Sequence, residues 1–182
     1  MSRTIALTGL PGAGKTTVGA VLAEAVGRRL VDTDAEVERH VGRDVPTIFA
    51  EAGEGYFRSV EQQVVRVLSA HDDLVLSLGG GAVLSDANVA DLLVSGVLVH
   101  LDAPADVLAE RLVGDTGRPL LAGDVPGRLR ELHAERDARY REVADVVVDA
   151  TGSPVEVAGA ILTWAVARRD VLTPSEHEAV LA

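Results

Sequence analysis

Short runs of apolar residues alternate along the chain with longer segments in which apolar positions recur every three or four residues. The short runs are typical of parallel strands buried on both faces, and the longer segments are typical of the helices that connect such strands. The pattern therefore predicts a three-layer α/β/α fold around a parallel sheet of five strands. The predicted strands are 4–8, 29–32, 74–78, 97–101 and 145–148.

Between these strands the helical period and the start and stop signals predict the connecting helices, several of which have proline in the first turn. The predicted helices are 15–26, 35–41, 46–52, 54–70, 86–94, 104–113, 126–143 and 154–168. The glycine-rich stretch 114–127 shows no period, so we expect a loop whose length indicates a function. We expect one domain over 1–169 and a poorly ordered tail over 170–182.

Length and charge narrow the class of protein. The 182 residues are 47% hydrophobic, which suits one compact core. A formal net charge of -11 argues against a nucleic-acid binder, and no apolar run is long enough to span a membrane. The chain has no cysteine, which excludes a thiolate metal site and a cysteine nucleophile and fits a reducing compartment. We expect a cytoplasmic monomer that binds neither nucleic acid nor a membrane.

The strongest chemical signal is the segment GLPGAGKT at 9–16, which lies between a predicted strand and a predicted helix. This is the phosphate-binding P-loop pattern, in which backbone N–H groups and the helix N-terminus hold phosphate oxygens. Lys15 is then expected to contact the β- and γ-phosphates, and Thr16 to ligate Mg²⁺. The alternative is a glycine-rich turn with a chance lysine, but Lys15 is the only lysine in the chain. The residues expected to bind nucleotide here are Gly12, Ala13, Gly14, Lys15, Thr16 and Thr17.

A pair of carboxylates follows the second predicted strand. Asp32 and Asp34 stand two residues apart, so both side chains are placed at the strand edge that opens onto the ligand site. One is suited to hold Mg²⁺ through water and the other to orient or deprotonate an attacking hydroxyl. Capping of the next helix is the alternative role for Asp34, and Asp102 and Asp149 are rival acids at the ends of other strands.

Three arginines are candidate anion ligands. Arg58 has Glu54 and Glu61 at helical spacing, which by itself favours a surface ion pair. Arg136 has no carboxylate three or four residues away, so an external anion and simple exposure remain open for it. Arg118 lies in the glycine-rich loop, where an arginine finger on a phosphate is one interpretation.

A guanine-specific GTPase switch is excluded because the chain has no N-K-x-D element.

Six segments in order resemble the shikimate kinase family, and the resemblance covers about 4–165. They are GLPGAGKT, LVDTD, IFAEAGEGYFRSVE, LSLGGGAV, RPLL and HAERDARY. The resemblance implies a nucleoside-monophosphate-kinase-like P-loop fold with strand order 2-3-1-4-5, a substrate-binding segment at about 33–61 and a mobile lid at about 112–126. It also implies transfer of phosphate from ATP, with Mg²⁺, to shikimate, in the pathway to chorismate and the aromatic amino acids.

The resemblance carries roles to particular positions of this sequence. Asp34 looks like the acid that meets the shikimate hydroxyls and takes the proton, and Asp32 is similar to the water-mediated Mg²⁺ partner. Arg118 resembles the lid arginine on the ATP phosphates, and Arg111 resembles the residue that stacks on adenine. The positions that look like the shikimate site are Arg58 and Arg136 for the carboxylate, Glu61 for orienting Arg58, Gly79, Gly80 and Gly81 for backbone contacts, and Phe49 and Phe57 for the wall.

The sequence departs from the family at 150–154, where an arginine that helps to flank adenine is missing. This departure concerns nucleotide selectivity and not the reaction. Two other functions remain open at this point: a kinase for another small hydroxy acid such as gluconate, and an ATP-binding regulatory protein without catalysis. The combination of Lys15, Asp32, Asp34 and Arg118 argues against the second of these.

Overall fold

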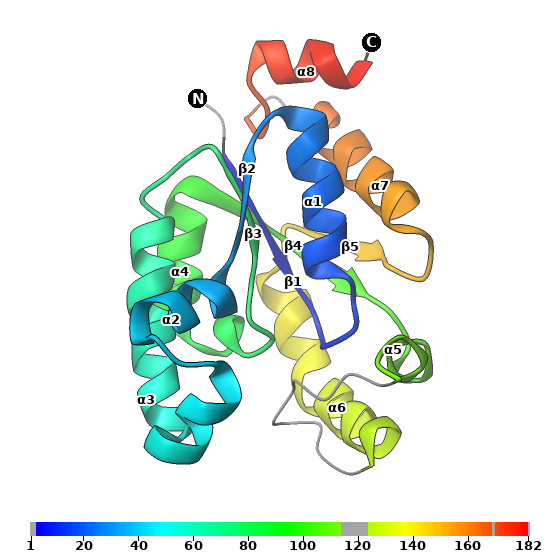
Figure 1. Cartoon of the computed structure of the whole chain (residues 1–182). Coiled ribbons are helices and arrows are strands. Elements are labelled where there is room, and N and C mark those ends of the chain that lie inside the picture. Colours follow the sequence, from blue (N-terminus) through cyan, green and yellow to red (C-terminus); the bar gives the residue numbers. More distant parts are fainter. Residues whose placement is uncertain (1–2, 114–123, 169, 182) are drawn as a thin grey trace.

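The computed structural model of the chain describes residues 3–113, 124–168 and 170–181 (Figure 1). At its centre lies one parallel sheet with the strand order β2-β3-β1-β4-β5. This confirms the predicted fold class and the order 2-3-1-4-5. The strands are β1 (Thr4–Thr8), β2 (Arg29–Asp32), β3 (Leu74–Ser77), β4 (Gly96–Asp102) and β5 (Val146–Asp149).

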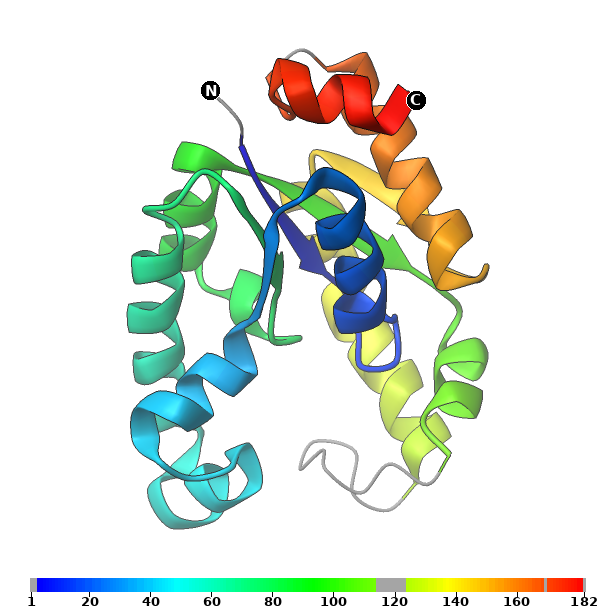
Figure 2. The same cartoon turned by 45° about the horizontal axis from the view of Figure 1, so that its top comes forward.

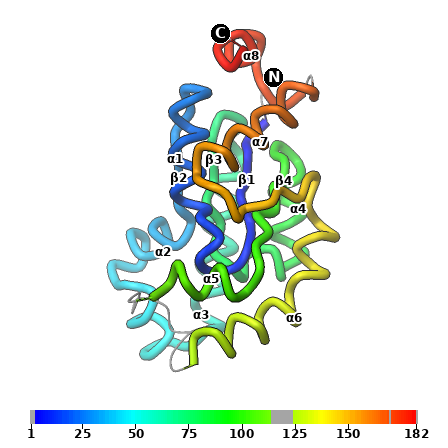
Figure 3. The backbone as a smooth tube through the Cα atoms, turned by 90° about the vertical axis from the view of Figure 1, so that its right-hand side faces the viewer, coloured from blue at the N-terminus to red at the C-terminus, as the bar shows by residue number. Residues whose placement is uncertain are grey.

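Helices cover both faces of the sheet (Figures 1 and 3). They are α1 (Lys15–Val26), α2 (Thr33–Val41), α3 (Val45–Leu68), α4 (Asp86–Ser95), α5 (Ala105–Arg111), α6 (Val125–Val143), α7 (Pro154–Ala167) and α8 (Pro174–Leu181), with a 3₁₀ turn η1 (Ala82–Leu84). Helices α1 and α7 pack against each other on one face, and α3, α4 and α6 lie on the other. None of the described helices is long and apolar enough to cross a membrane.

The main core is built on β1 and β3, which bury every residue. All five residues of β1 and all four of β3 are buried, as the uninterrupted apolar runs predict. The parallel register pairs Asp32 with Ser77 and Thr8 with His100, so the carboxyl ends of the strands meet at one edge. Figure 2 shows the turn before α1 at this edge, between α2 and α3 on one side and α5 and α6 on the other.

The predicted break between helices 46–52 and 54–70 corresponds to a kink inside α3. Gly53 has φ 80° and ψ 168°, which is not helical, and it divides the helix into two segments at the expected place. Elsewhere the bounds of the predicted elements differ from the observed ones by at most two residues, whereas η1 and α8 were not predicted. Helix α5 is shorter than the predicted 104–113, because Pro104 caps it and Leu112 leaves the helical conformation.

The tail contains a helix that the pattern did not predict. It contains α8, and the buried Arg28 joins it to the start of the sheet. The Arg28 guanidinium donates to Glu176 at 2.7 Å, to the carbonyl of Arg3 at 2.6 Å and to the carbonyl of Val171 at 2.8 Å. A buried arginine with its donors satisfied by a carboxylate and two carbonyls is a specific anchor, so the tail packs against the domain.

Candidate active site

The P-loop adopts the conformation that its glycines predict. Gly12 and Gly14 have φ of 84° and 86°, a region that other residues rarely occupy. A Cβ on Gly12 would lie 2.9 Å from the carbonyl oxygen of Leu108, so the close approach of α5 also requires glycine there. The Lys15 ammonium donates to the carbonyls of Gly9 at 2.9 Å and Leu10 at 3.2 Å, which keeps it over the loop.

A cluster of three oxygen-bearing side chains lies directly beside the P-loop. Thr16 Oγ1 donates to Asp32 Oδ2 at 2.8 Å and lies 2.9 Å from Ser77 Oγ. The other oxygen of Asp32 accepts from the N–H groups of Asp34 and Ala35 and thereby caps α2. The capping role considered for Asp34 therefore belongs to Asp32, which leaves Asp34 inside the first turn of the helix.

Ser77 was not among the candidates from the sequence, because a serine at the end of an apolar strand has no chemical signature of its own. The only signal was its position, since the register places Ser77 opposite Asp32 at the carboxyl edge of the sheet. Hydroxyl and carboxylate oxygens are the ligands that Mg²⁺ prefers. The donors present at Thr16, Asp32 and Ser77 thus fit that ion.

Two carboxylates meet at Gly79. A Cβ on this glycine would collide with Asp34 Oδ1 and would lie 2.8 Å from Glu61 Oε1, so the acids of α2 and α3 both lie against its Cα. The Gly79 N–H donates to Thr33 Oγ1 at 2.8 Å, which fixes the strand end to the start of α2. Burial raises the pKa of Glu61, Arg58 partly opposes this, and the negative charge of Asp34 adds to it.

Arg58 is held by both acids that the sequence placed around it. It donates to Glu61 at 2.9 Å and to Glu54 at 3.0 Å, and its side chain is 28% exposed. Burial works against the charge of Arg58, but the two carboxylates outweigh it and its pKa is raised. A Cβ on Gly81 would collide with the guanidinium, so Arg58 lies directly over the triple glycine. The ion pair and a place in the site are therefore compatible.

Arg136 reaches the triple glycine from α6. It is buried on α6, and Nη1 donates to the carbonyl of Gly80 at 3.4 Å. Simple exposure, which the sequence left open, is wrong for this residue. The hydroxyl of Tyr140, one helical turn later, donates to the same carbonyl. Tyr140 was not among the candidates from the sequence, because a tyrosine on an amphipathic helix is usually a core residue.

The two phenylalanines belong to a separate apolar cluster under Arg58. Their ring centroids are 4.9 Å apart, and the Arg58 guanidinium lies 5.2 Å from the centroid of Phe57. Phe57 is buried among Val37, Ile48 and Val60, whereas Phe49 is partly exposed. Phe57 is therefore a core residue, and Phe49 is the ring with accessible surface.

A cavity of about 360 Å³ joins the P-loop to the carboxylates, a size typical of sites for small ligands. Arg111 lies at its rim and donates to the carbonyl of Thr151 at 3.1 Å, next to the segment where the sequence departs from the family. Arg118 lies outside the described residues. The residues around the cavity are Gly12, Gly14, Lys15, Thr16, Thr17, Asp32, Asp34, Ser77, Leu78, Gly80, Arg111 and Leu112.

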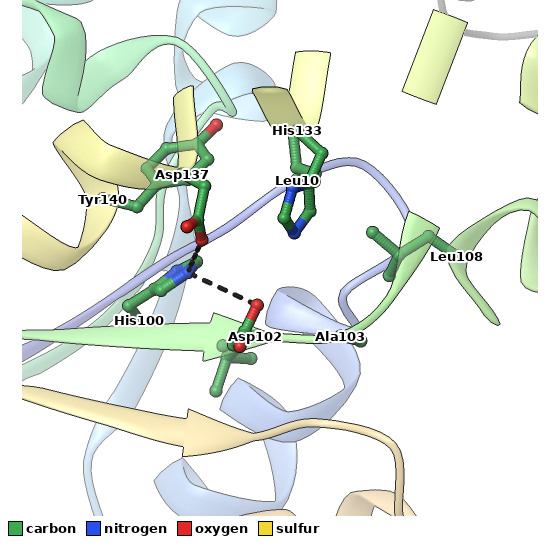
Figure 4. Close-up of a pocket in the computed structure, with 9 residues that line it drawn as sticks. Leu10, His100, Asp102, Ala103, Leu108, His133, Asp137 and Tyr140 are labelled. Carbon is green, nitrogen blue, oxygen red and sulfur yellow. Dashed lines mark ion pairs between the residues drawn. The ribbon is translucent and has the colours of Figure 1, made fainter. Parts of the chain in front are cut away.

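A much smaller cavity of about 10 Å³ lies behind the P-loop (Figure 4). There the buried His100 stacks on Tyr140, with ring centroids 5.0 Å apart, and its Nε2 lies 3.9 Å from Asp102 and 4.0 Å from Asp137. Both carboxylates already bind Arg141, at 2.6 and 2.9 Å. Burial lowers the pKa of His100 in spite of the nearby acids. Asp102, a rival for the metal side of the site, is thus engaged elsewhere.

Comparisons with known proteins agree with this geometry. The family model described as "SKI: Shikimate kinase" matches residues 11–165. The shikimate kinase of Halorhodospira halophila is 48% identical over 149 residues, which are 81% of this chain and 84% of the relative. The shikimate kinase of Mycobacterium tuberculosis is 44% identical over 171 residues, which are 93% and 95% of the two chains.

Among solved structures, the shikimate kinase from Acinetobacter baumannii in complex with shikimate aligns with a TM-score of 0.89 at 38% identity. The alignment covers 93% of this chain and 96% of the other. The family match over 11–165 includes Gly12–Thr16 of the P-loop, α3, α6 and the triple glycine. The chain therefore belongs to the shikimate kinase family and is an ATP-dependent kinase that phosphorylates a hydroxyl group.

Proposed function

We propose that the cavity binds ATP at the P-loop and shikimate at the triple glycine, and that the γ-phosphoryl group passes directly to a shikimate hydroxyl. The observation that carries this proposal is that Asp34 and Lys15 line one cavity. An acid for the acceptor hydroxyl and a cation for the transferred phosphate therefore border the same space. Such transfers depend mainly on alignment and charge neutralisation.

The nucleotide half of the site consists of the loop amides, Lys15, Thr16, Thr17 and Arg111. Successive N–H groups before α1 bind phosphate oxygens, and Lys15 exchanges its two carbonyl partners for the β- and γ-phosphates. Arg111 lies between the P-loop and Thr151, where it flanks the adenine. We also predict that Arg118 binds the ATP phosphates. Arg118→Ala is therefore expected to lower turnover by about 10³-fold or more.

Thr16 and Asp32 are the residues that would hold Mg²⁺, with Ser77 as a further oxygen ligand. The ion, when bound, neutralises charge on the β- and γ-phosphates. Asp32 keeps its orientation because its other oxygen caps α2. The rigid cap therefore sets the position of the carboxylate in advance.

The acceptor half binds a small acid with hydroxyl groups. Arg58 and Arg136 approach the Gly79–Gly81 segment from α3 and α6, which suits a carboxylate held between two guanidinium groups. Asp34 accepts the proton of the attacking hydroxyl. Glu61 orients Arg58, and Phe49 offers the ring an apolar wall. We also propose that the protein is a monomer located in the cytoplasm.

The test is a coupled assay of ADP release with Mg·ATP and one acceptor at a time. Shikimate is compared with gluconate, quinate, AMP and no acceptor. Release that depends on shikimate alone supports the proposal. Release with gluconate points to the alternative hydroxy-acid kinase, and ATP binding without release under any acceptor points to a regulatory protein. The comparisons favour neither alternative.

A further inference from the structure

Tyr140 is a buried polar residue that the proposed reaction does not use. It is 1% exposed and lies one turn after Arg136 on the inner face of α6. Its hydroxyl donates to the carbonyl of Gly80, and Arg136 donates to the same oxygen at 3.4 Å. Two donors from one helix therefore converge on one peptide of the triple glycine.

This double contact fixes the direction of the peptide between Gly80 and Gly81. The chain has no cis peptide bond in the described residues, so the carbonyl of Gly80 and the N–H of Gly81 point in opposite directions. With the carbonyl held toward α6, the Gly81 N–H points away from α6. Neither Gly80 nor Gly81 has an acceptor for its N–H within the described residues. Both N–H groups are therefore candidates for hydrogen bonds to a ligand.

Gly80 itself makes no side-chain contact that could hold this orientation. It has no side chain, and the nearest atoms to a Cβ built on it are the Gly9 carbonyl and Pro11 at 3.7 Å and the Tyr140 hydroxyl at 3.9 Å. Glycine peptides are free to rotate unless hydrogen bonds restrain them. The Ala82 N–H donates to the carbonyl of Gly79 at 3.0 Å and closes a turn around this peptide, but among the described residues only Arg136 and Tyr140 donate to the Gly80 carbonyl itself.

The ring of Tyr140 is itself held by stacking on His100. Figure 4 shows it beside His100, and the two rings are stacked with an interplanar angle of 29°. Burial raises the pKa of the Tyr140 phenol, more than the nearby Arg136 lowers it, so the hydroxyl remains a donor at neutral pH. The rigid strand β4 therefore sets the place of the ring, and the ring sets the place of the hydroxyl.

We propose that Tyr140 is a positioning residue for acceptor binding: its hydroxyl holds the Gly80 peptide so that the glycine N–H groups and Arg136 present one fixed geometry to the acceptor. This inference rests on the proposed function. Loss of the hydroxyl frees the peptide and weakens acceptor binding, whereas the P-loop and the nucleotide half are unaffected.

The test is Tyr140→Phe in the full chain, which keeps the ring and its stacking on His100. We expect KM for shikimate to rise about fivefold to tenfold and KM for ATP to stay within about twofold of the wild-type value. The matched control is Tyr56→Phe, because Tyr56 is the other tyrosine and is 46% exposed. A merely structural hydroxyl would lower Tm and leave both KM values unchanged, and that result would overturn the proposal.

A second measurement does not depend on the folding of Tyr140→Phe. In the Tyr56→Phe background, uniform labelling with 3-fluorotyrosine places the fluorine at Tyr140 alone. We expect its ¹⁹F resonance to shift on addition of shikimate without nucleotide, and an unshifted resonance would contradict the proposal. If the unlabelled wild type shows no shikimate-dependent ADP release, the proposed function itself fails, and this outcome is separate from any result at Tyr140.

Discussion

The hydroxyl of Thr16 donates to Asp32 at 2.8 Å, which joins the first turn of α1 to the end of β2. This bond places one carboxylate oxygen at the P-loop, while the second oxygen caps α2 at 3.0 Å. A single side chain therefore supports the helix that carries Asp34 and faces the phosphate site. The two roles of Asp32 are separable by substitution.

We predict that Asp32→Asn retains the cap but loses the metal role, because asparagine is as good an N-cap as aspartate. The Mg²⁺ concentration for half-maximal activity should rise severalfold, and Tm should stay close to that of the wild type. Asp32→Ala should in addition lose about 1 kcal/mol of stability. A magnesium titration followed by thermal unfolding checks both variants. An Asp32→Asn enzyme with unchanged Mg²⁺ dependence would show that the carboxylate does not serve the ion.

Asp34→Asn is expected to lower kcat by about 10² to 10⁴, the range of a positioned general base. The amide has nearly the same shape, so shikimate should still bind with an affinity measurable by titration calorimetry. The measurement is kcat beside the calorimetric Kd. A loss confined to affinity, with kcat intact, would assign Asp34 to binding alone.

Two neighbouring glycines should respond differently to alanine. In Gly79→Ala the new Cβ would collide with Asp34 and approach Glu61, so both acids must move and activity should fall by orders of magnitude. In Gly80→Ala the nearest protein atoms are 3.7 Å away, an ordinary contact, so Tm should change little. Tm and kcat/KM of both variants test this contrast. An active Gly79→Ala enzyme would contradict the placement of Asp34.

Glu61 should make acceptor binding depend on pH. Burial raises the pKa of Glu61, so as pH falls this carboxyl takes up a proton earlier than an ordinary one, and Arg58 then loses its charged partner. KM for shikimate should therefore rise as pH is lowered, more steeply than in Glu61→Gln, where the side chain has no charge at any pH. Glu54→Gln is the control, since Glu54 is 55% exposed. If KM for shikimate changed with pH to the same extent in wild type and in Glu61→Gln, this role of Glu61 would be refuted.

The raised pKa of Glu61 has the opposite effect on stability. The folded state binds the proton more tightly than the unfolded chain, so ionisation of Glu61 costs stability as pH rises through its raised pKa. Acceptor binding and stability thus change in opposite directions over the same interval.

His100 should make the fold sensitive to mild acid. Burial lowers its pKa below 6.5, so the unfolded chain binds protons that the folded state does not, and stability falls as pH drops through this interval. The groups that face it are Asp102, Asp137, Arg141, Tyr140 and Thr8. Urea unfolding from about pH 7.5 to about pH 5.5 should show a smaller loss in His100→Gln than in wild type. The exposed His40 supplies the control variant His40→Gln, which should behave as the wild type does.

Much of the fold follows from local sequence rules. Strand order could be predicted only through the family resemblance, but the strands themselves follow from apolar runs that are buried on both faces. The kink at Gly53 could also be predicted, because a glycine between two helical patterns is a strong local signal. The packing of the tail could not be predicted, since its anchor Arg28 lies 148 residues before Glu176 in the sequence.

The site divides in the same way. The P-loop and the Asp32–Asp34 pair are local patterns, so the sequence identified them without tertiary information. Ser77 and Tyr140 acquire their roles only through partners on other elements, and no local pattern distinguishes them from ordinary packing residues. The position of Arg136 was undecided in the sequence for the same reason, since its partner Gly80 is 56 residues away.

The anchor at Arg28 limits how this enzyme can be recombined with its relatives. The family match spans 11–165, which includes Arg28 but none of its acceptors at Arg3, Val171 and Glu176. A chimera that grafts only the matched segment into another scaffold would bury a guanidinium away from its own partners, at a cost of several kcal/mol unless the new flanks replace them. A chimera must therefore include the segments on both sides of the matched one, which hold Arg3, Val171 and Glu176.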